Sequence, residues 1–301
     1  MEDRYNHLNK FLKDKFKERT LKICIDGSFT CPNRDGTKGV GGCIFCGERG
    51  SGENTKCLSI KEQVENYFKS YKADRANKFI VYFQNFTNTY DSIENLKRKY
   101  DEALIDDRIV AMDIATRADC ISEDICKLLA TYKQKYYVYC EIGLQTANDD
   151  THNKNNQHIT NDDFIKAISL LNKYDIDVVC HVMVGLPGES HEDIVNTVNL
   201  LNSVKYSGIK IHSTYVIKDT VLEGMYNSHE YEPITIDDYI DEVVYILTHI
   251  NKDVIVHRIT GDPPKDILIA PSWANHKKII LNSIENRLKN DNLYQGCLFG
   301  K

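Results

Sequence analysis

The feature that most limits the fold of this chain is a repeated alternation of apolar, β-branched segments with longer amphipathic segments. Six such strand-then-helix units follow one another along the sequence. Strands of this composition are covered on at least one face, and successive units of this kind form parallel sheets joined by helical crossovers. The sequence therefore predicts an α/β fold. The expected strands are residues 21–25, 79–83, 109–114, 136–142, 178–184 and 209–216, and the expected helices are residues 59–71, 93–104, 123–132, 161–173, 191–205, 236–250 and 276–288.

A single domain accounts for a chain of this size. The 301 residues, 42% of them hydrophobic, are enough for one large core. A doubly wound sheet and a complete or partial barrel fit the alternation equally well. In both, ligands bind beyond the carboxyl ends of the strands, so the residues after each strand are the candidates for chemistry. A further apolar run, residues 254–257, precedes the last helix.

The cysteine content and the absence of apolar spans point to a cytoplasmic protein that binds a metal. No apolar run approaches the roughly 20 residues that span a bilayer. The N-terminus is charged from its second residue, unlike a signal peptide. Ten cysteines in a cytoplasmic chain are more consistent with metal ligands or reactive thiols than with disulfides, because that compartment keeps thiols reduced.

The long glycine-rich loop after the first expected strand contains the strongest metal-binding pattern. Cys43 and Cys46 form a Cys-x-x-Cys pair, and the eleven residues that separate Cys31 from Cys43 leave slack for a third thiolate to join them. Three ligands leave one iron of a cluster open to a further ligand. A structural zinc site takes four, and the fourth would have to come from Cys24 or Cys57.

This loop resembles the cluster-binding loop of the radical S-adenosylmethionine (SAM) superfamily. Its wide first gap departs from the superfamily's commonest spacing, Cys-x3-Cys-x2-Cys. The gap and residues 29–36 (FTCPNRDG) are similar to the YhcC/YtqA branch, relatives of the elongator-complex catalytic subunit. The resemblance implies a partial (β/α)6 barrel at residues 21–250, after a basic segment at 1–20 and before a C-terminal extension at 251–301 that closes the barrel.

The resemblance also implies the cofactors and the chemistry. The cofactors are a [4Fe–4S] cluster and SAM, whose reductive cleavage gives a 5′-deoxyadenosyl radical. The cluster ligands are then Cys31, Cys43 and Cys46. Phe45 occupies the position that packs near the SAM adenine in the family, and Gln84, after the second strand, can accept a hydrogen bond from the SAM ammonium.

Further SAM-binding candidates follow the later strands. Residues 141–146 (EIGLQT) resemble the family segment that holds SAM through its ribose and methionine ends, with Glu141 and Gln145 as its polar members. Glu141 falls on a buried strand, where an unpaired carboxylate is costly, so a hydrogen-bonding partner is expected. Gly185 begins a turn that resembles the one beside the adenine, and Arg117 can fork onto a carboxylate of SAM or substrate.

The sequence does not single out catalytic groups. The candidates are His212, Lys218 and Arg117, each of a type that is more often structural when it occurs alone. Residues 258–264 and 270–274 are unusual for a surface segment and resemble the same branch, which suggests that they close the barrel mouth. The cysteines without ligand-like spacing are interpreted as small apolar residues; they are Cys24, Cys120, Cys126, Cys140, Cys180 and Cys297.

The resemblance implies a tRNA wobble uridine as substrate, with conversion of a carboxymethylaminomethyl group to aminomethyl. The partners are then tRNA and an electron donor such as flavodoxin or ferredoxin. The net charge of −6 opposes unaided binding of a polyanion, so a local basic patch is needed. Alternatives are a radical SAM enzyme acting on a small metabolite or protein side chain, and a non-catalytic zinc-binding module. The densest basic patch is Arg4, Lys10, Lys13, Lys15, Lys17, Arg19 and Lys22.

Overall fold

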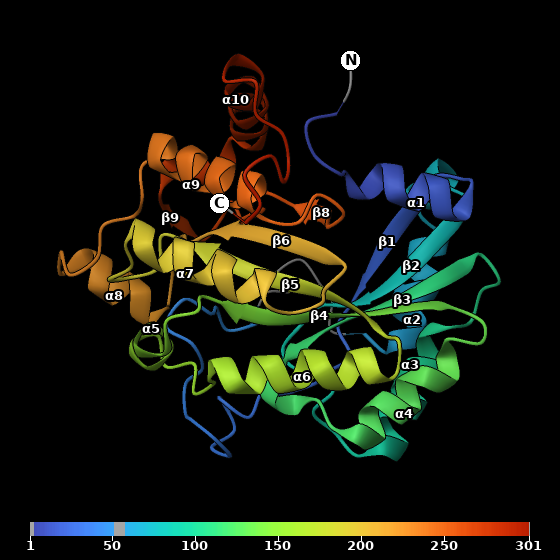
Figure 1. Ribbon diagram of the computed structural model, residues 1–301. Coiled ribbons are helices and arrows are strands. Elements are labelled where there is room, and N and C mark those ends of the chain that lie inside the picture. Colours follow the sequence, from blue (N-terminus) through green and yellow to red (C-terminus); the bar gives the residue numbers. More distant parts are fainter. Residues whose placement is uncertain (1–2, 51–57, 301) are drawn as a thin grey trace.

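The computed structural model describes residues 3–50 and 58–300, and its centre is a sheet of seven parallel strands (Figure 1). The order across the sheet is β1-β2-β3-β4-β5-β6-β8. Cys57, considered above as a zinc ligand, lies outside the described residues. The strands are β1 (Thr20–Ile25), β2 (Lys78–Phe83), β3 (Ile109–Arg117), β4 (Tyr137–Gln145), β5 (Asp177–Val184), β6 (Gly208–Ser213) and β8 (Ile255–Arg258).

The strand order decides between the two α/β alternatives. Each strand pairs with the one before it in the sheet's sequence order, and the order never reverses as it does in a doubly wound sheet. Right-handed crossovers then place the helices on one face of the sheet, and Figure 1 shows α4, α6 and α7 along that outer face. The expected partial barrel is confirmed, and β8 adds a seventh strand to the six that were predicted.

Seven longer helices lie within a few residues of their predicted bounds, and three others were not predicted as helices. Side-chain caps define several starts; Thr160 and Asp163 form a reciprocal capping box at the start of α6. The helices are α1 (Leu8–Phe16), α2 (Ile60–Phe68), α3 (Ile93–Ala103), α4 (Glu123–Tyr132), α5 (Asp149–Lys154), α6 (Asn161–Lys173), α7 (His191–Asn202), α8 (Val221–Asn227), α9 (Ile236–His249) and α10 (Lys277–Asn290), with 3-10 turns at Ala73–Arg75, Ala118–Cys120 and Ser272–Asn275.

The main core lies between the sheet and the outer helices. On β3, Met112 and Ile114 are fully buried and belong to this core. The intervening Ala111 and Asp113 are also buried but lie on the opposite face, since successive side chains of a strand alternate. The inner face therefore encloses a second, narrower interior, which we call the lumen.

Helix α1 closes the lumen at the amino-terminal end of the strands. Leu12 is 4% exposed and packs against inward-facing side chains near the strand starts, among them Ile80 and Tyr139. The helix contacts both β1 and β8, and His7 pairs with Val256 of β8. The basic segment of the sequence is thus held at the end of the barrel opposite to the cysteine loop, which follows the carboxyl end of β1.

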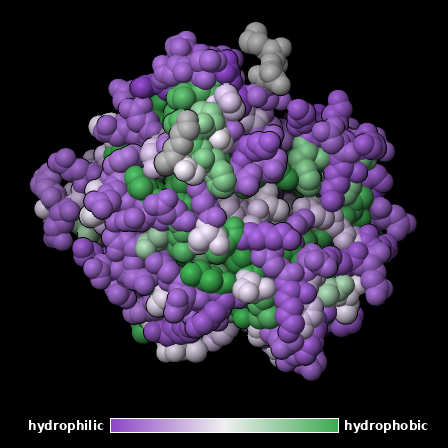
Figure 2. Space-filling model, in the orientation of Figure 1, coloured by the Kyte–Doolittle hydropathy of each residue, from purple (hydrophilic) through white to green (hydrophobic). Residues whose placement is uncertain are grey.

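The C-terminal segment contributes residues 258–264 to the carboxyl end of the barrel, and its last residues contact Arg4 and Asn6 at the N-terminus. A two-stranded antiparallel sheet joins β7 (Val216–Ile217) to β9 (Leu268–Ala270), and α10 packs against α9. Hydrophilic side chains dominate the face in Figure 2, with apolar side chains in smaller patches. None of the helices in the described residues combines the length and apolar character needed to cross a membrane.

Candidate active site

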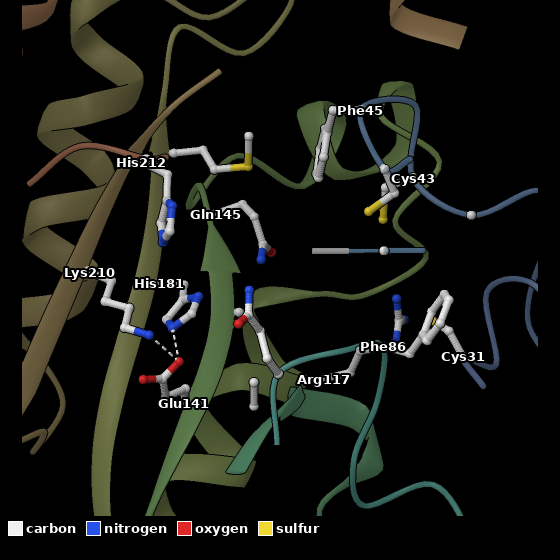
Figure 3. A pocket seen from close by; sticks show the side chains of 18 of the residues that line it. Cys31, Cys43, Phe45, Phe86, Arg117, Glu141, Gln145, His181, Lys210 and His212 are labelled. Carbon is white, nitrogen blue, oxygen red and sulfur yellow. Dashed lines mark hydrogen bonds and ion pairs between the residues drawn. The ribbon is translucent and has the colours of Figure 1, made fainter. Parts of the chain in front are cut away.

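A cavity of about 450 Å³ lies at the carboxyl ends of the strands. Its lining comes from the cysteine loop, the inward face of the sheet and residues 258–264. Figure 3 shows Cys31 and Cys43 on one side of this cavity and residues of β4 to β6, including His181 and His212, on the other. The cavity therefore has the cysteines, as candidate cluster ligands, on one side and charged residues of the strands on the other.

The loop brings all three predicted ligands to the cavity wall. Cys31, Cys43 and Cys46 are each partly buried and line the cavity. The buried side-chain amide of Asn33 lies 3.6 Å from Cys43 Sγ and donates toward it. Gly42, with φ of +83°, could carry no side chain without meeting Arg34, since a Cβ there would lie 2.8 Å from Arg34 Nε.

The end of α5 holds the loop in place. The Asn156 side chain donates to the carbonyl oxygens of Val40 and Gly42, at 3.1 and 2.7 Å. The Ile44 backbone N–H donates to the Asn155 carbonyl oxygen at 3.2 Å. These contacts connect the loop to the segment after β4, so the cysteines are positioned by tertiary contacts as well as by their spacing.

The electrostatics of the loop act in opposite directions on the two thiols of the Cys-x-x-Cys pair. A hydrogen bond from the Cys43 thiol lowers the pKa of Cys46 despite burial, and Arg34 adds to this effect. The same hydrogen bond and burial raise the pKa of Cys43. In residues 3–50 and 58–300, no three or more His, Cys, Asp or Glu side chains are grouped as ligands of one metal ion.

The predicted SAM residue Gln145 is held in an uncommon conformation at the cavity wall. Its φ is +62°, a left-handed value that is rare outside glycine and is often found at functional sites. Its side chain folds back over Gly143, where a Cβ would lie 2.3 Å from Gln145 Nε2. Gln157, which also lines the cavity, donates to Gln145 Oε1 at 3.0 Å. The pair presents amide groups to any ligand beside the cysteines.

Four other predicted SAM residues also line the cavity: Phe45, Gln84, Arg117 and Glu141. Arg117 forms a two-pronged ion pair with Asp119, at 2.9 and 2.8 Å. Although burial alone lowers the pKa of Arg117, this pair and the nearby cysteines raise it, so the group is a fixed positive charge beside the loop. Gly185 does not line the cavity; its carbonyl accepts from Tyr231, and its missing side chain leaves room for Ile234.

Glu141 has the partner that its burial required, and more than one. Its Oε2 lies 2.5 Å from Lys210 Nζ and 2.9 Å from His181 Nε2, while Oε1 lies 3.2 Å from Lys22 Nζ. Burial raises the pKa of Glu141, but the two lysines lower it further, so the net pKa is well below the usual value. Both carboxylate oxygens are therefore paired within the lumen, where Glu141 holds the two lysines and His181 together, and its contact with SAM stays a prediction.

The outcome for the catalytic candidates is mixed. His212 lines the cavity, and its buried Nε2 has no hydrogen-bond partner among the described residues. Lys218 is exposed and does not line the cavity, because β7 turns it outward. Lys22, counted above as part of a surface patch, instead pairs with Asp113 and Glu141 inside the lumen.

The sequence interpretation missed most of the lumen residues. Lys210 and His181 lie at inward positions of strands that are otherwise apolar. Cys24, interpreted as a small apolar core residue, is exposed to the cavity that it lines. The signal available was a polar residue at every second position of buried strands, because period-2 alternation places such residues on one face.

Comparison with known families decides the identity. A profile described as "Radical SAM superfamily" matches residues 31–201, which include all three loop cysteines, and a "Radical_SAM C-terminal domain" profile matches residues 206–290. The chain belongs to the radical SAM superfamily. It is therefore a radical SAM enzyme, with a [4Fe–4S] cluster and SAM as cofactors, and the zinc-binding module is excluded as its function.

Relatives of this radical SAM enzyme cover its whole length. YtqA of Bacillus subtilis is 35% identical over 99% of this chain and 94% of its own, and YhcC of Escherichia coli K12 is 30% identical over 96% and 94%. A "tRNA uridine(34) acetyltransferase" of Methanocaldococcus jannaschii is 28% identical over 54% of this chain and 30% of its own.

Solved radical SAM structures share the fold. The Elp3 structure from Methanocaldococcus infernus superimposes with a TM-score of 0.69 at 18% identity, covering 92% of this chain and 64% of that one. Streptococcus suis SuiB, solved with bound S-adenosylmethionine, gives a TM-score of 0.52 at 17% identity, covering 84% and 53%. The barrel described above thus has the same fold as the archaeal Elp3 structure.

Proposed function

We propose that this enzyme modifies a wobble uridine of tRNA, converting its carboxymethylaminomethyl group to aminomethyl. The observation that carries the proposal is the alignment of over half the chain with a tRNA uridine(34) acetyltransferase. The similarity to Elp3 over 92% of the chain supports the same substrate class. A small metabolite or a protein side chain is the rival substrate, and the experiment below separates the two.

The protein groups have distinct tasks in this reaction. Cys31, Cys43 and Cys46 hold the cluster, and Gln145 with Gln157 orients SAM beside it. When bound, the cluster and SAM would supply a 5′-deoxyadenosyl radical able to take a hydrogen atom from the carbon next to the substrate carboxylate. Residues 258–264 and the β7–β9 pair cover the cavity and limit the entry of water. A one-electron acceptor then takes a second electron, and one water hydrolyses the resulting imine to the amine and glyoxylate.

The size of the cavity constrains how tRNA would bind. A volume of about 450 Å³ lies in the range of small-molecule sites, so it accommodates a nucleoside and SAM groups but no folded RNA. The target base would have to leave its stack. Extrusion costs least where the base is already single-stranded, as in an anticodon loop.

The position of α1 changes which lysines are candidates for phosphate contacts. The basic residues of α1 lie at the closed end of the barrel, so the N-terminal patch is poorly placed for RNA at the mouth. Lys154, Lys218 and Lys265 are exposed on segments that follow the carboxyl ends of strands. We name these three the mouth lysines and assign the phosphate contacts to them.

Turnover of a defined tRNA tests the proposed reaction. The cluster-loaded enzyme is incubated anaerobically with SAM, reductant and tRNA that carries carboxymethylaminomethyluridine. We expect 5′-deoxyadenosine formation that depends on this tRNA, release of glyoxylate, and aminomethyluridine in the nucleoside mass spectrum. If 5′-deoxyadenosine formed equally with and without the tRNA and the nucleoside mass did not change, the tRNA substrate would be rejected in favour of a small metabolite or a protein side chain.

A salt series tests the surface assignment with a matched pair of variants. Replacing the three mouth lysines by Gln should lower the slope of log affinity against log salt by about 2 to 3, because each lost phosphate contact removes roughly one unit. The control replaces Lys10, Lys13 and Lys17 of the N-terminal segment, which are also exposed, and should leave the slope unchanged. If the N-terminal variant lowered the slope and the mouth-lysine variant did not, the RNA-binding surface would be assigned to the N-terminal segment instead.

A further inference from the structure

The floor of the cavity contains a positive charge that the lumen network does not neutralise. Lys22 is paired with Asp113, and Lys210 is paired with Glu141. Arg258, which also lines the cavity, has Asp262 as its ion-pair partner at 3.4 Å. Both oxygens of Asp262 are already bound to Lys277 at 2.8 Å, so this carboxylate is shared at the exposed rim.

A β-bulge turns Arg258 toward the lumen. Ile209 pairs with Val256, but the next residue, Lys210, pairs with Arg258, so one residue of β8 is left without a partner. That residue, His257, also lies inside, 5.7 Å from the Tyr139 ring between centroids. Two consecutive residues of β8 therefore reach the interior, and Arg258 faces the cavity beside Lys210.

A histidine with a free ring nitrogen lies next to this arginine. The His212 ring is 5.2 Å from the His181 ring, and Gly261 approaches it closely enough that a Cβ would lie 3.9 Å from His212 Nδ1. The segment after Arg258 thus packs over His212. Burial and the neighbouring cations hold the pKa of His212 well below its usual value, so the ring is neutral and can donate one hydrogen bond.

We propose that Arg258 and His212, beside Lys210, form a subsite for the carboxylate of the substrate. A guanidinium matches a carboxylate with two parallel hydrogen bonds, and the neutral His212 ring forms part of the wall of the same cavity. The proposal rests on the proposed function only for the molecule that carries the carboxylate. Figure 3 shows Lys210 and His212 on the side of the cavity away from Cys31 and Cys43, and Arg258 pairs with Lys210 in the sheet, so the subsite takes a substrate group and not the carboxylate of SAM.

Anchoring this group would explain selectivity at the reacting carbon. In a carboxymethylaminomethyl group, the carbon that loses hydrogen is bonded directly to the carboxylate. Holding the carboxylate in place therefore also holds the reacting carbon, which is only one bond away. The aminomethyl product has no carboxylate, so it loses the interaction and dissociates more readily.

Binding measurements test the subsite without turnover. Calorimetry on cluster-loaded, SAM-bound protein would compare the nucleosides carboxymethylaminomethyluridine and aminomethyluridine, and NMR titration would follow N-methylglycine as the bare carboxylate probe. Arg258→Gln should weaken the two carboxylate probes roughly 10- to 100-fold and leave the aminomethyl nucleoside unchanged, as expected for a charge-assisted hydrogen bond. Arg258→Lys keeps the positive charge but cannot make two parallel hydrogen bonds, so it should lose less affinity for these probes than Arg258→Gln.

The controls separate the competing explanations. Lys278→Gln removes an exposed positive charge from α10, also in the C-terminal segment but not in the cavity wall, and should leave every affinity unchanged. If Arg258→Gln weakened SAM instead of the carboxylate probes, or if both probes bound equally well to it and to wild type, the subsite would be wrong. Arg258-dependent binding of N-methylglycine without tRNA turnover would keep the subsite and reject the tRNA substrate. Turnover of the tRNA together with binding of N-methylglycine that does not depend on Arg258 would keep the tRNA substrate and reject the subsite.

Discussion

Glu141→Gln should destabilise the protein strongly, because it removes the carboxylate that keeps Lys210 charged inside the lumen. The Lys210 side chain is 5% exposed, and its ion pair with Glu141 is 2.5 Å long. Breaking such a buried pair costs about 3–5 kcal/mol of unfolding free energy, since the remaining charge is left without compensation. Lys22 keeps Asp113 as a partner, so the loss falls mainly on Lys210.

Urea unfolding of cluster-loaded protein at pH 7 would measure this cost as a shift of the midpoint at constant slope. Glu102→Gln is the control, because it breaks only an exposed pair with Arg98, for which less than about 1 kcal/mol is expected. Adding Lys210→Met to Glu141→Gln should recover at least half of the loss, since an apolar side chain of similar length removes the stranded charge.

The pH dependence gives an independent test of the same reasoning. Burial lowers the pKa of Lys210 to about 8, despite the raising effect of Glu141. Between about pH 8 and the usual lysine value of roughly 10.4, the folded state binds fewer protons than the unfolded state, so Lys210 makes the unfolding free energy rise with pH. The cost of Glu141→Gln should therefore shrink above pH 8. The account would be refuted if Glu141→Gln cost less than about 1 kcal/mol of unfolding free energy at pH 7. It would also be refuted if the effects of Glu141→Gln and Lys210→Met on the unfolding free energy were strictly additive.

Three further outcomes follow from the site. Cys43→Ala should lose most bound iron and sulfide after anaerobic reconstitution, whereas Cys24→Ala, whose thiol also lines the cavity, should retain them by iron assay. Gln145→Ala or Gln157→Ala should weaken SAM binding by about 1–3 kcal/mol in calorimetry with normal iron content; unchanged affinity in both would remove the pair from the SAM site. Burial raises the pKa of Glu189 to about 7. Between about pH 4.5 and 7 the folded protein therefore keeps a proton that the unfolded protein has lost, so the unfolding free energy falls as the pH rises. Glu189→Gln should flatten this decline, as measured by thermal melts.

The sequence predicted the longer elements because their apolar periods are clear, and it missed those without a period to detect. Strand β8 has four residues, two of which, His257 and Arg258, are polar. Helices α5 and α8 have six and seven residues, fewer than the window in which a helical period is distinct. The parallel order of the sheet could be predicted only as one of two alternatives, since it depends on pairing between segments far apart in the chain.

The site was predictable where one segment contains it. The three cysteines and Gln145 follow from local patterns and their family resemblance, and the structure brings them to one cavity. The charge network was not predictable in this way, because the partners of Glu141 come from three other strands. Lys22 illustrates the limit: several basic residues precede it between positions 10 and 19, but its position in β1 turns it inward.

Helix α1 also bears on how the two edge strands of the sheet are protected. An open barrel has two edge strands, and unpaired edges can add strands from another molecule. Here α1 lies against both edge strands, and His7 occupies backbone positions of β8 that would otherwise accept a foreign strand. Its apolar side chains hold it in place, while the exposed Lys10, Lys13 and Lys17 place like charges over the seam. The most basic part of the chain thereby serves as a guard against edge-to-edge aggregation.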